Sequence, residues 1–169
     1  MDTRQEELRR RLGEAGFDEV RFATLASGYD DGLRAWLDAG LHGEMGWMER
    51  TADKRIDPQL VLPGACSAIM LGISYAEGGQ RDGGVASPTQ GVSVGERAGR
   101  PTWARYALNE DYHDTVKPGL IAAGRIMQEL YGIGERDYRY YVDTGPVLER
   151  GWAMISAGVP WATNSPPWI

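Results

Sequence analysis

The sequence predicts an α/β fold, with α+β as the alternative, in a single domain whose mixed sheet is flanked by helices. The first reason is that amphipathic helical patterns alternate with short strand-like runs along the chain. The second is length, because 169 residues are enough for one domain with its own core. The third is composition, since 42% apolar and 25% charged residues are typical of globular proteins.

In the first half of the chain we expect two longer helices and two strands. Residues 3–15 have leucines at helical spacing, and residues 17–23 alternate apolar and polar side chains, as a half-buried strand does. A second helix is expected around residues 33–37, with Asp30 or Asp31 as its N-cap. Residues 67–75 are almost continuously apolar, which predicts a central, fully buried strand.

In the second half we expect a short strand or turn at residues 103–108, followed by a helix over residues 112–130 and a strand over 137–142. Residues 143–146 form a predicted turn that ends in a proline. Because proline suits the first helical position, the last helix is expected to begin there and to end near residue 157.

The expected domain covers residues 1–158. Within it, residues 76–101 are rich in Gly, Ser and Pro and have few large apolar residues, so we expect a flexible loop there. Residues 159–169 are a separate Pro- and Trp-rich tail, in which the prolines oppose continuation of a regular element.

Charge and cysteine content exclude several classes of protein. A net charge of −6 argues against broad, non-specific nucleic-acid binding, which depends on many phosphate contacts. The single cysteine, Cys66, permits no intrachain disulfide and cannot by itself hold an iron–sulfur cluster. The chain shows no signal peptide and no apolar run long enough to span a membrane, so a cytoplasmic location is expected.

Asp143 is the strongest candidate for a catalytic residue. It lies at a predicted strand-to-helix junction, where ligands often meet α/β sheets, and a carboxyl in an apolar cleft can act as a proton donor. The alternative is an aspartate that only caps the turn. Arg55 is either a fixed cation at a ligand or a surface side chain, and Arg150 either faces the cleft or forms a salt bridge. The two histidines make no recognisable metal set.

Five separated segments, in this order and spacing, resemble epoxyqueuosine reductase, a cobalamin-dependent iron–sulfur enzyme that reduces epoxyqueuosine to queuosine in tRNA. The resemblance implies that Asp143 is the proton donor, and that Arg55, Ala104, Arg105 and, with weaker support, Arg150 border the cobalamin. The segments are GFDEVRFA (16–23), LRAWLDAGLHGEMGWMER (33–50), KRIDPQLVLPGACSAI (54–69), ARYALNEDYH (104–113) and VDTGPVLERGWA (142–153).

The resemblance covers residues 3–158 and then stops. The family continues with a glycine-rich segment and with cysteine motifs for two [4Fe–4S] clusters, and this chain has neither. We therefore expect a truncated reductase that is inactive alone, or one completed in trans by an iron–sulfur half. Two further hypotheses are a non-catalytic corrinoid-binding or protein-interaction module and a flavin-dependent reductase-like domain.

Overall fold

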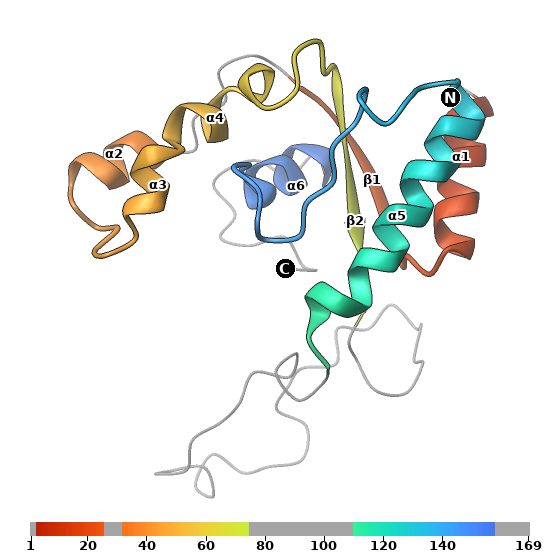
Figure 1. Ribbon diagram of the computed structural model, residues 1–169, viewed down its shortest axis with the longest axis horizontal. Helices are drawn as coiled ribbons and strands as arrows, with labels where there is room; N and C mark the ends of the chain where they lie inside the picture. Colours follow the sequence, from red (N-terminus) through yellow and green to blue (C-terminus); the bar gives the residue numbers. More distant parts are fainter. Residues whose placement is uncertain (1–2, 26–31, 75–109, 158–169) are drawn as a thin grey trace, which may run out of the picture.

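A computed structural model describes residues 3–25, 32–74 and 110–157 of the chain. Its elements alternate between helices and strands in the first half and are helical in the second (Figure 1). In chain order they are α1 (Thr3–Glu14), β1 (Glu19–Thr24), α2 (Leu33–Asp38), α3 (Gly46–Arg50), α4 (Ala52–Ile56), the 3-10 helix η1 (Pro58–Leu60), β2 (Ser67–Gly72), α5 (Tyr112–Tyr131) and α6 (Glu149–Ala157).

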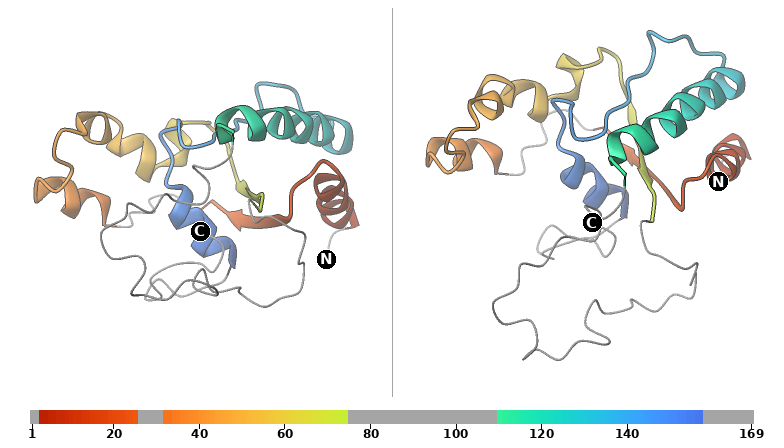
Figure 2. Two further views of the ribbon diagram at one scale, coloured as in Figure 1. Left: turned by 90° about the horizontal axis from the view of Figure 1, so that it is seen from below. Right: turned by 60° about the horizontal axis from the view of Figure 1, so that its bottom comes forward.

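The two strands pair antiparallel, with Glu19 opposite Gly72 and Thr24 opposite Ser67. Helices α1 and α5 lie side by side over one face of this sheet, and α6 lies against the other face (Figures 1 and 2). The short helices α2, α3 and α4 form an arm beyond α6 (Figure 1). The expected α/β class with flanking helices is confirmed, and the antiparallel pairing corresponds to its α+β form.

Each face of the sheet has its own hydrophobic core. On one face α1, β1 and α5 bury a cluster of seven residues: Leu8, Leu12, Phe17, Val20, Leu120, Ala123 and Ile126. On the other face α6 packs against β1 and the arm through six residues: Ala23, Leu33, Ala52, Ile56, Leu148 and Trp152.

The continuous apolar run of β2 is explained by these two cores. Ile69 and Leu71 pack against the first cluster, while Ala68 and Met70 pack against the second. Successive side chains of a strand point to opposite faces, so a strand covered on both faces has no polar side. The expected full burial is nevertheless wrong, because these residues are only partly buried and β2 pairs with β1 alone among the described strands.

Helix α5 confirms the expected helix over residues 112–130. Asp111 caps it, because its side chain accepts the N–H of His113 at 2.9 Å. Pro118 lies inside the helix, as the seventh of its 20 residues. Gly132 ends the helix in the left-handed conformation, with φ 67°.

The strand expected at residues 137–142 is wrong, because this segment is irregular. Its Tyr138 ring packs onto Gly124 of α5 so closely that a Cβ there would lie 2.6 Å from the phenolic oxygen, and the hydroxyl accepts the Gln128 amide at 2.9 Å. These contacts attach the segment to α5 instead of to a strand. Pro146 is also not the first residue of the last helix, which begins at Glu149.

Several expectations concern residues outside the described ranges. They are the cap at Asp30 or Asp31, the loop at 76–101, the strand or turn at 103–108 and the tail at 159–169. The domain limits accordingly stay predictions. In the part of the chain that is described, no helix has both the length and the apolar character that a bilayer crossing requires.

Candidate functional site

The candidate site lies at the bend that precedes α6, and Asp143 is its centre. Asp143 is the only non-glycine residue with positive φ among those described, at 54°. The N–H of Thr144 donates to the Val142 carbonyl at 2.6 Å, which closes a three-residue γ-turn around Asp143. This left-handed conformation is unfavourable for residues with a Cβ and often occurs at functional sites.

A close packing contact stabilises the same bend. A Cβ added to Gly145 would lie 2.3 Å from Cγ of Tyr141, well inside contact distance. Only glycine therefore lets the chain fold back over the Tyr141 ring. The glycine of the Asp-Thr-Gly-Pro sequence thus has a steric role next to the strained aspartate.

The first turn of α5 supplies a partner for the Asp143 carboxylate. The Tyr112 hydroxyl donates a short hydrogen bond to Oδ2 of Asp143. The Tyr112 ring stacks on His113, with centroids 4.3 Å apart, and Nδ1 of His113 lies 2.8 Å from the Asp111 carboxylate. The three consecutive residues 111–113 thus cap the helix, orient the tyrosine and engage the aspartate.

Arg55 connects α4 to the other end of the bend. Its Nη1 donates to the Val147 carbonyl at 3.0 Å, and its Nε donates to Oγ1 of Thr51 at 3.0 Å. The Thr51 hydroxyl in turn donates to the Trp47 carbonyl at 2.7 Å. The guanidinium is half-buried and fixed by two directed bonds, which a planar fork of donors makes efficiently.

Glu149, the first residue of α6, interacts electrostatically with both Asp143 and Arg55. Burial raises the pKa of its carboxyl above the ordinary value of 4.5, and the charge of Asp143 raises it further. The positive charge of Arg55 and the backbone N–H groups of Glu149 and Asp143 lower this pKa and oppose the first two effects. Its Oε1 is buried and has no hydrogen-bond partner among the described residues.

The structure thus brings together two of the predicted site residues, Asp143 and Arg55, which both act on Glu149. Asp143 was expected at a strand-to-helix junction. It lies instead in an irregular segment, six residues before α6, with an exposed side chain. Arg150 is exposed in the first turn of α6. Ala104 and Arg105 are outside the described residues.

Tyr112 and Glu149 are members of the site that sequence pattern did not single out. A tyrosine beside a helix cap has many roles, and nothing local connects it to a residue 31 positions away. Glu149 has the ordinary signature of a first-turn acid at a helix N-terminus. One indication of their role was present in the sequence. Tyr112 and Glu149 lie in two of the segments that resemble the reductase family, ARYALNEDYH (104–113) and VDTGPVLERGWA (142–153).

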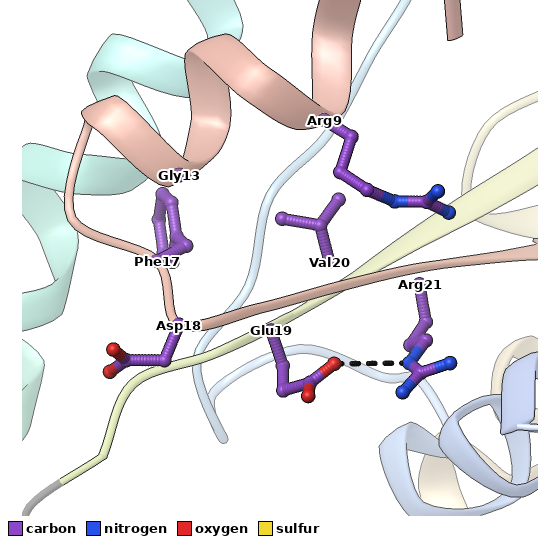
Figure 3. A pocket seen from close by; sticks show the side chains of 7 residues that line it. All are labelled: Arg9, Gly13, Phe17, Asp18, Glu19, Val20 and Arg21. Atoms are coloured by element: carbon purple, nitrogen blue, oxygen red, sulfur yellow. Dashed lines mark hydrogen bonds and ion pairs between the residues drawn. The ribbon is translucent and has the colours of Figure 1, made fainter. Parts of the chain in front are cut away.

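A separate shallow hollow of about 390 Å³ lies between α1 and β1, away from this site (Figure 3). Two basic and two acidic side chains line it, and Arg21 pairs with Glu19 at 3.1 Å. Arg9 covers the Phe22 ring at 5.2 Å. These charges compensate one another and favour neither an anion nor a cation. Three or more His, Cys, Asp or Glu side chains do not gather as a metal site anywhere in the described ranges.

Comparison with known proteins assigns the chain. The model of the family described as epoxyqueuosine reductase QueG, DUF1730 matches residues 55–144, more than half of the sequence. The chain belongs to the epoxyqueuosine reductase family. The matched span includes Arg55, Tyr112 and Asp143, so it covers most of the site described above.

Individual members of the epoxyqueuosine reductase family agree with this assignment. The epoxyqueuosine reductase of Xanthomonas campestris is 39% identical over 150 residues, which cover 88% of this chain and 39% of the relative. That of Vibrio cholerae is 37% identical, covering 88% and 37%, and that of Cyclobacterium marinum is 32% identical, covering 91% and 45%. The chain therefore spans less than half the length of these relatives. No solved structure matches it.

Proposed function

We propose that this chain forms the acid-bearing part of an epoxyqueuosine reductase, which reduces epoxyqueuosine in tRNA to queuosine. One observation supports this most directly: the Tyr112 hydroxyl and the strained turn together orient the Asp143 carboxyl on an exposed part of the bend, where a substrate can reach it. A tRNA substrate also places the reaction in the cytoplasm.

The proposed role of Asp143 is to protonate the epoxide oxygen. Opening an epoxide leaves an alkoxide-like oxygen, and a positioned acid lowers the barrier by giving it a proton. Tyr112 restricts the rotation of the carboxyl, so that the acid does not need to be ordered when the substrate binds. The Asp143 backbone, fixed by the γ-turn, serves the same purpose.

The described residues fit one wall of a cobalamin site. Arg55 is held by two hydrogen bonds, and a guanidinium has five N–H groups, so it retains donors for the amide or phosphate groups of a corrinoid. Near Arg55, the buried Oε1 of Glu149 is an acceptor that has no hydrogen-bond partner among the described residues. We propose Arg55, Ala104, Arg105 and Arg150 as the cobalamin-facing residues. Bound cobalamin would supply the reducing chemistry at the epoxide.

The [4Fe–4S] clusters require ligands from outside these 169 residues. Each cluster takes about four thiolates, and the chain has one cysteine. We propose that a cysteine-rich iron–sulfur part, either of the same protein or in trans, delivers the electrons, and that the 169-residue chain alone does not turn over. Basic surface for the tRNA would come from that part, because this chain has a net charge of −6.

Two measurements test the proposal. The purified chain is titrated with cobalamin and followed by its visible spectrum, with Arg55→Ala as the weakened variant. The chain is also expressed in a bacterium that lacks epoxyqueuosine reductase, with and without the cysteine-rich part of a relative, and queuosine is quantified in digested tRNA by mass spectrometry.

We expect cobalamin binding, and queuosine only when the cysteine-rich part is present. Asp143→Asn should abolish queuosine in that pairing while the chain stays folded. Asp114→Asn, in an exposed position of α5, is the matched control and should have no effect. Absence of both cobalamin binding and queuosine in the paired strain would refute the proposal.

A further inference from the structure

Thr51 lies at the junction of α3 and α4, and its hydroxyl is not needed to form either helix. The residue is the C-cap of α3 and the N-cap of α4, and its backbone makes the helical bonds. The Thr51 N–H donates to the Trp47 carbonyl at 3.2 Å, and the Thr51 carbonyl accepts the N–H of Arg55 at 3.0 Å. The side-chain bonds of Thr51 are therefore additional to those that form the two helices.

The Thr51 hydroxyl makes two side-chain hydrogen bonds whose directions are fixed by chemistry. It donates its single proton to the Trp47 carbonyl at 2.7 Å, because a carbonyl can only accept. Its oxygen accepts the Nε–H of Arg55 at 3.0 Å, because this group can only donate. The first bond is ordinary, since threonine hydroxyls often bond the carbonyl four residues before them. The second bond makes Thr51 part of the candidate site.

The guanidinium of Arg55 is fixed at two of its nitrogen atoms. Thr51 holds Nε, and the Val147 carbonyl, on the bend before α6, accepts a hydrogen bond from Nη1 at 3.0 Å. Two bonds set both the position and the orientation of the rigid guanidinium plane, whereas the Val147 bond alone would let the plane rotate. A guanidinium has five N–H groups, so three remain on Nη1 and Nη2 once these two are used.

Arg55 forms no ion pair with a carboxylate in the described part of the chain, although acids are close in the sequence. Asp53 pairs with Arg34 at 2.8 Å, and Asp57 caps the 3-10 helix η1. Glu149 interacts with the Arg55 charge but does not pair with it. Both hydrogen-bond partners of the guanidinium are neutral oxygens, so its orientation is set without a directly paired acid.

We propose that Thr51 is a positioning residue for Arg55: its hydroxyl, anchored on the Trp47 carbonyl, orients the guanidinium so that the three remaining N–H groups face a ligand. Thr51 itself does not touch that ligand. The identity of the ligand rests on the proposed function, in which Arg55 faces cobalamin. The fixing of Arg55 by Thr51 does not rest on it, because only residues of this chain take part.

The first test follows the Nε–H of Arg55 in ¹⁵N–¹H NMR spectra of the 169-residue chain and measures its exchange with solvent. The signal is assigned by its loss in Arg55→Lys. Thr51→Val keeps the shape of the side chain without the hydroxyl, and the backbone N–H of residue 51 still satisfies the Trp47 carbonyl. We expect exchange about fivefold faster, which corresponds to one hydrogen bond of about 1 kcal/mol. Thr51→Ser keeps the hydroxyl and should exchange like wild type.

Thr115→Val is the matched control for this exchange measurement. The Thr115 hydroxyl also donates to a carbonyl of the preceding turn, that of Tyr112 at 3.3 Å, but no arginine donates to it among the described residues. Exchange at Arg55 should therefore be unchanged. Unchanged exchange in Thr51→Val, or equally fast exchange in Thr51→Ser, overturns the positioning role. If Thr51→Val does not fold, Thr51→Ala replaces it, because alanine also lacks the hydroxyl and favours helices.

A second test connects this positioning to the ligand. Cobalamin is titrated into wild type, Thr51→Val, Arg55→Ala and the double variant. Thr51→Val should weaken binding, and the double variant should bind like Arg55→Ala, because a residue that acts through Arg55 has no effect once Arg55 is removed. Additive losses would overturn the role of Thr51 toward the ligand. If wild type does not bind cobalamin, the proposed function fails, and the exchange test still decides whether Thr51 fixes Arg55.

Discussion

The hydroxyl of Tyr112 donates a hydrogen bond to the carboxylate of Asp143, joining the first turn of α5 to the bend that leads into α6. These elements belong to different layers, since α5 covers one face of the sheet and α6 the other (Figure 1). The bond therefore orients the proposed acid relative to the long helix as well as to its own turn.

Tyr112→Phe should impair the proposed acid much more than it impairs folding. A hydrogen bond to a charged group contributes about 1.5–3 kcal/mol when buried, and this one is exposed, so we expect a loss of at most about 1 kcal/mol in the free energy of unfolding. Urea denaturation measures that loss. Queuosine formation with the cysteine-rich part supplied should fall clearly, because the carboxyl rotates freely. Tyr131→Phe, at the exposed C-terminal end of α5, is the control. Equal queuosine in both variants would contradict this role of Tyr112.

Gly145→Ala should distort the bend by a steric clash. The new Cβ would lie 2.3 Å from the Tyr141 ring, and relieving such overpacking typically costs about 1–3 kcal/mol. Gly13→Ala is the matched control: it lies in α1 with nothing within 4 Å of the new Cβ, and alanine is favoured over glycine in a helix by about 1 kcal/mol. Thermal unfolding should move down for the first and up for the second. A Gly145→Ala protein as stable as wild type would show that the bend can rearrange.

The elements predicted with most success are those whose pattern is set within the element. Helix α5 has its apolar positions, its Asp111 cap and its Gly132 stop in the local sequence, and its predicted limits agree with the structure to within a residue. The strand β2 was located correctly because both of its faces are covered, but its degree of burial depends on how many strands pair with it.

The site was harder to predict because its contacts connect distant parts of the chain. Residues 137–142 alternate like a strand, yet the close fit of Tyr138 on Gly124 attaches them to α5, and no local pattern records that fit. Arg55 and Val147 are separated by 92 positions and meet only in the folded chain. Sequence pattern made Asp143 and Arg55 candidates and the family resemblance gave them roles, whereas Tyr112 and Glu149 required the structure.

Arg55→Lys should disconnect α4 from the bend although it keeps the positive charge. Lysine cannot reproduce the planar fork that bonds Thr51 and Val147 together. Two neutral-acceptor hydrogen bonds contribute about 1 kcal/mol each, so we expect a loss of about 1–2 kcal/mol in the free energy of unfolding. The neighbouring, exposed Lys54→Arg should change stability little. Chemical denaturation measures the free energy of unfolding of both variants. An Arg55→Lys protein as stable as wild type would show that the positive charge alone is enough to hold α4 to the bend.

The free energy of unfolding should include a contribution from Glu149 that declines as pH rises. The pKa of this carboxyl is raised in the folded state by burial, so the folded chain binds the proton more tightly than the unfolded chain. The contribution is therefore fully present below the unfolded value near 4.5 and is lost as pH rises from there through the folded pKa. Hydrogen bonds from Arg10 and His113 lower the pKa values of Glu7 and Asp111, respectively. The contributions of these two groups to the free energy of unfolding therefore increase as pH rises.

Glu149→Gln isolates this component, because glutamine keeps the size of the side chain and does not ionise. The free energy of unfolding, measured by urea denaturation at several pH values, should fall less steeply above pH about 4.5 in Glu149→Gln than in wild type. The exposed Glu135→Gln should follow wild type, since its carboxyl has no comparable burial. Parallel curves for wild type and Glu149→Gln would mean that Glu149 ionises alike in the folded and unfolded chains, and would contradict a pKa raised by burial.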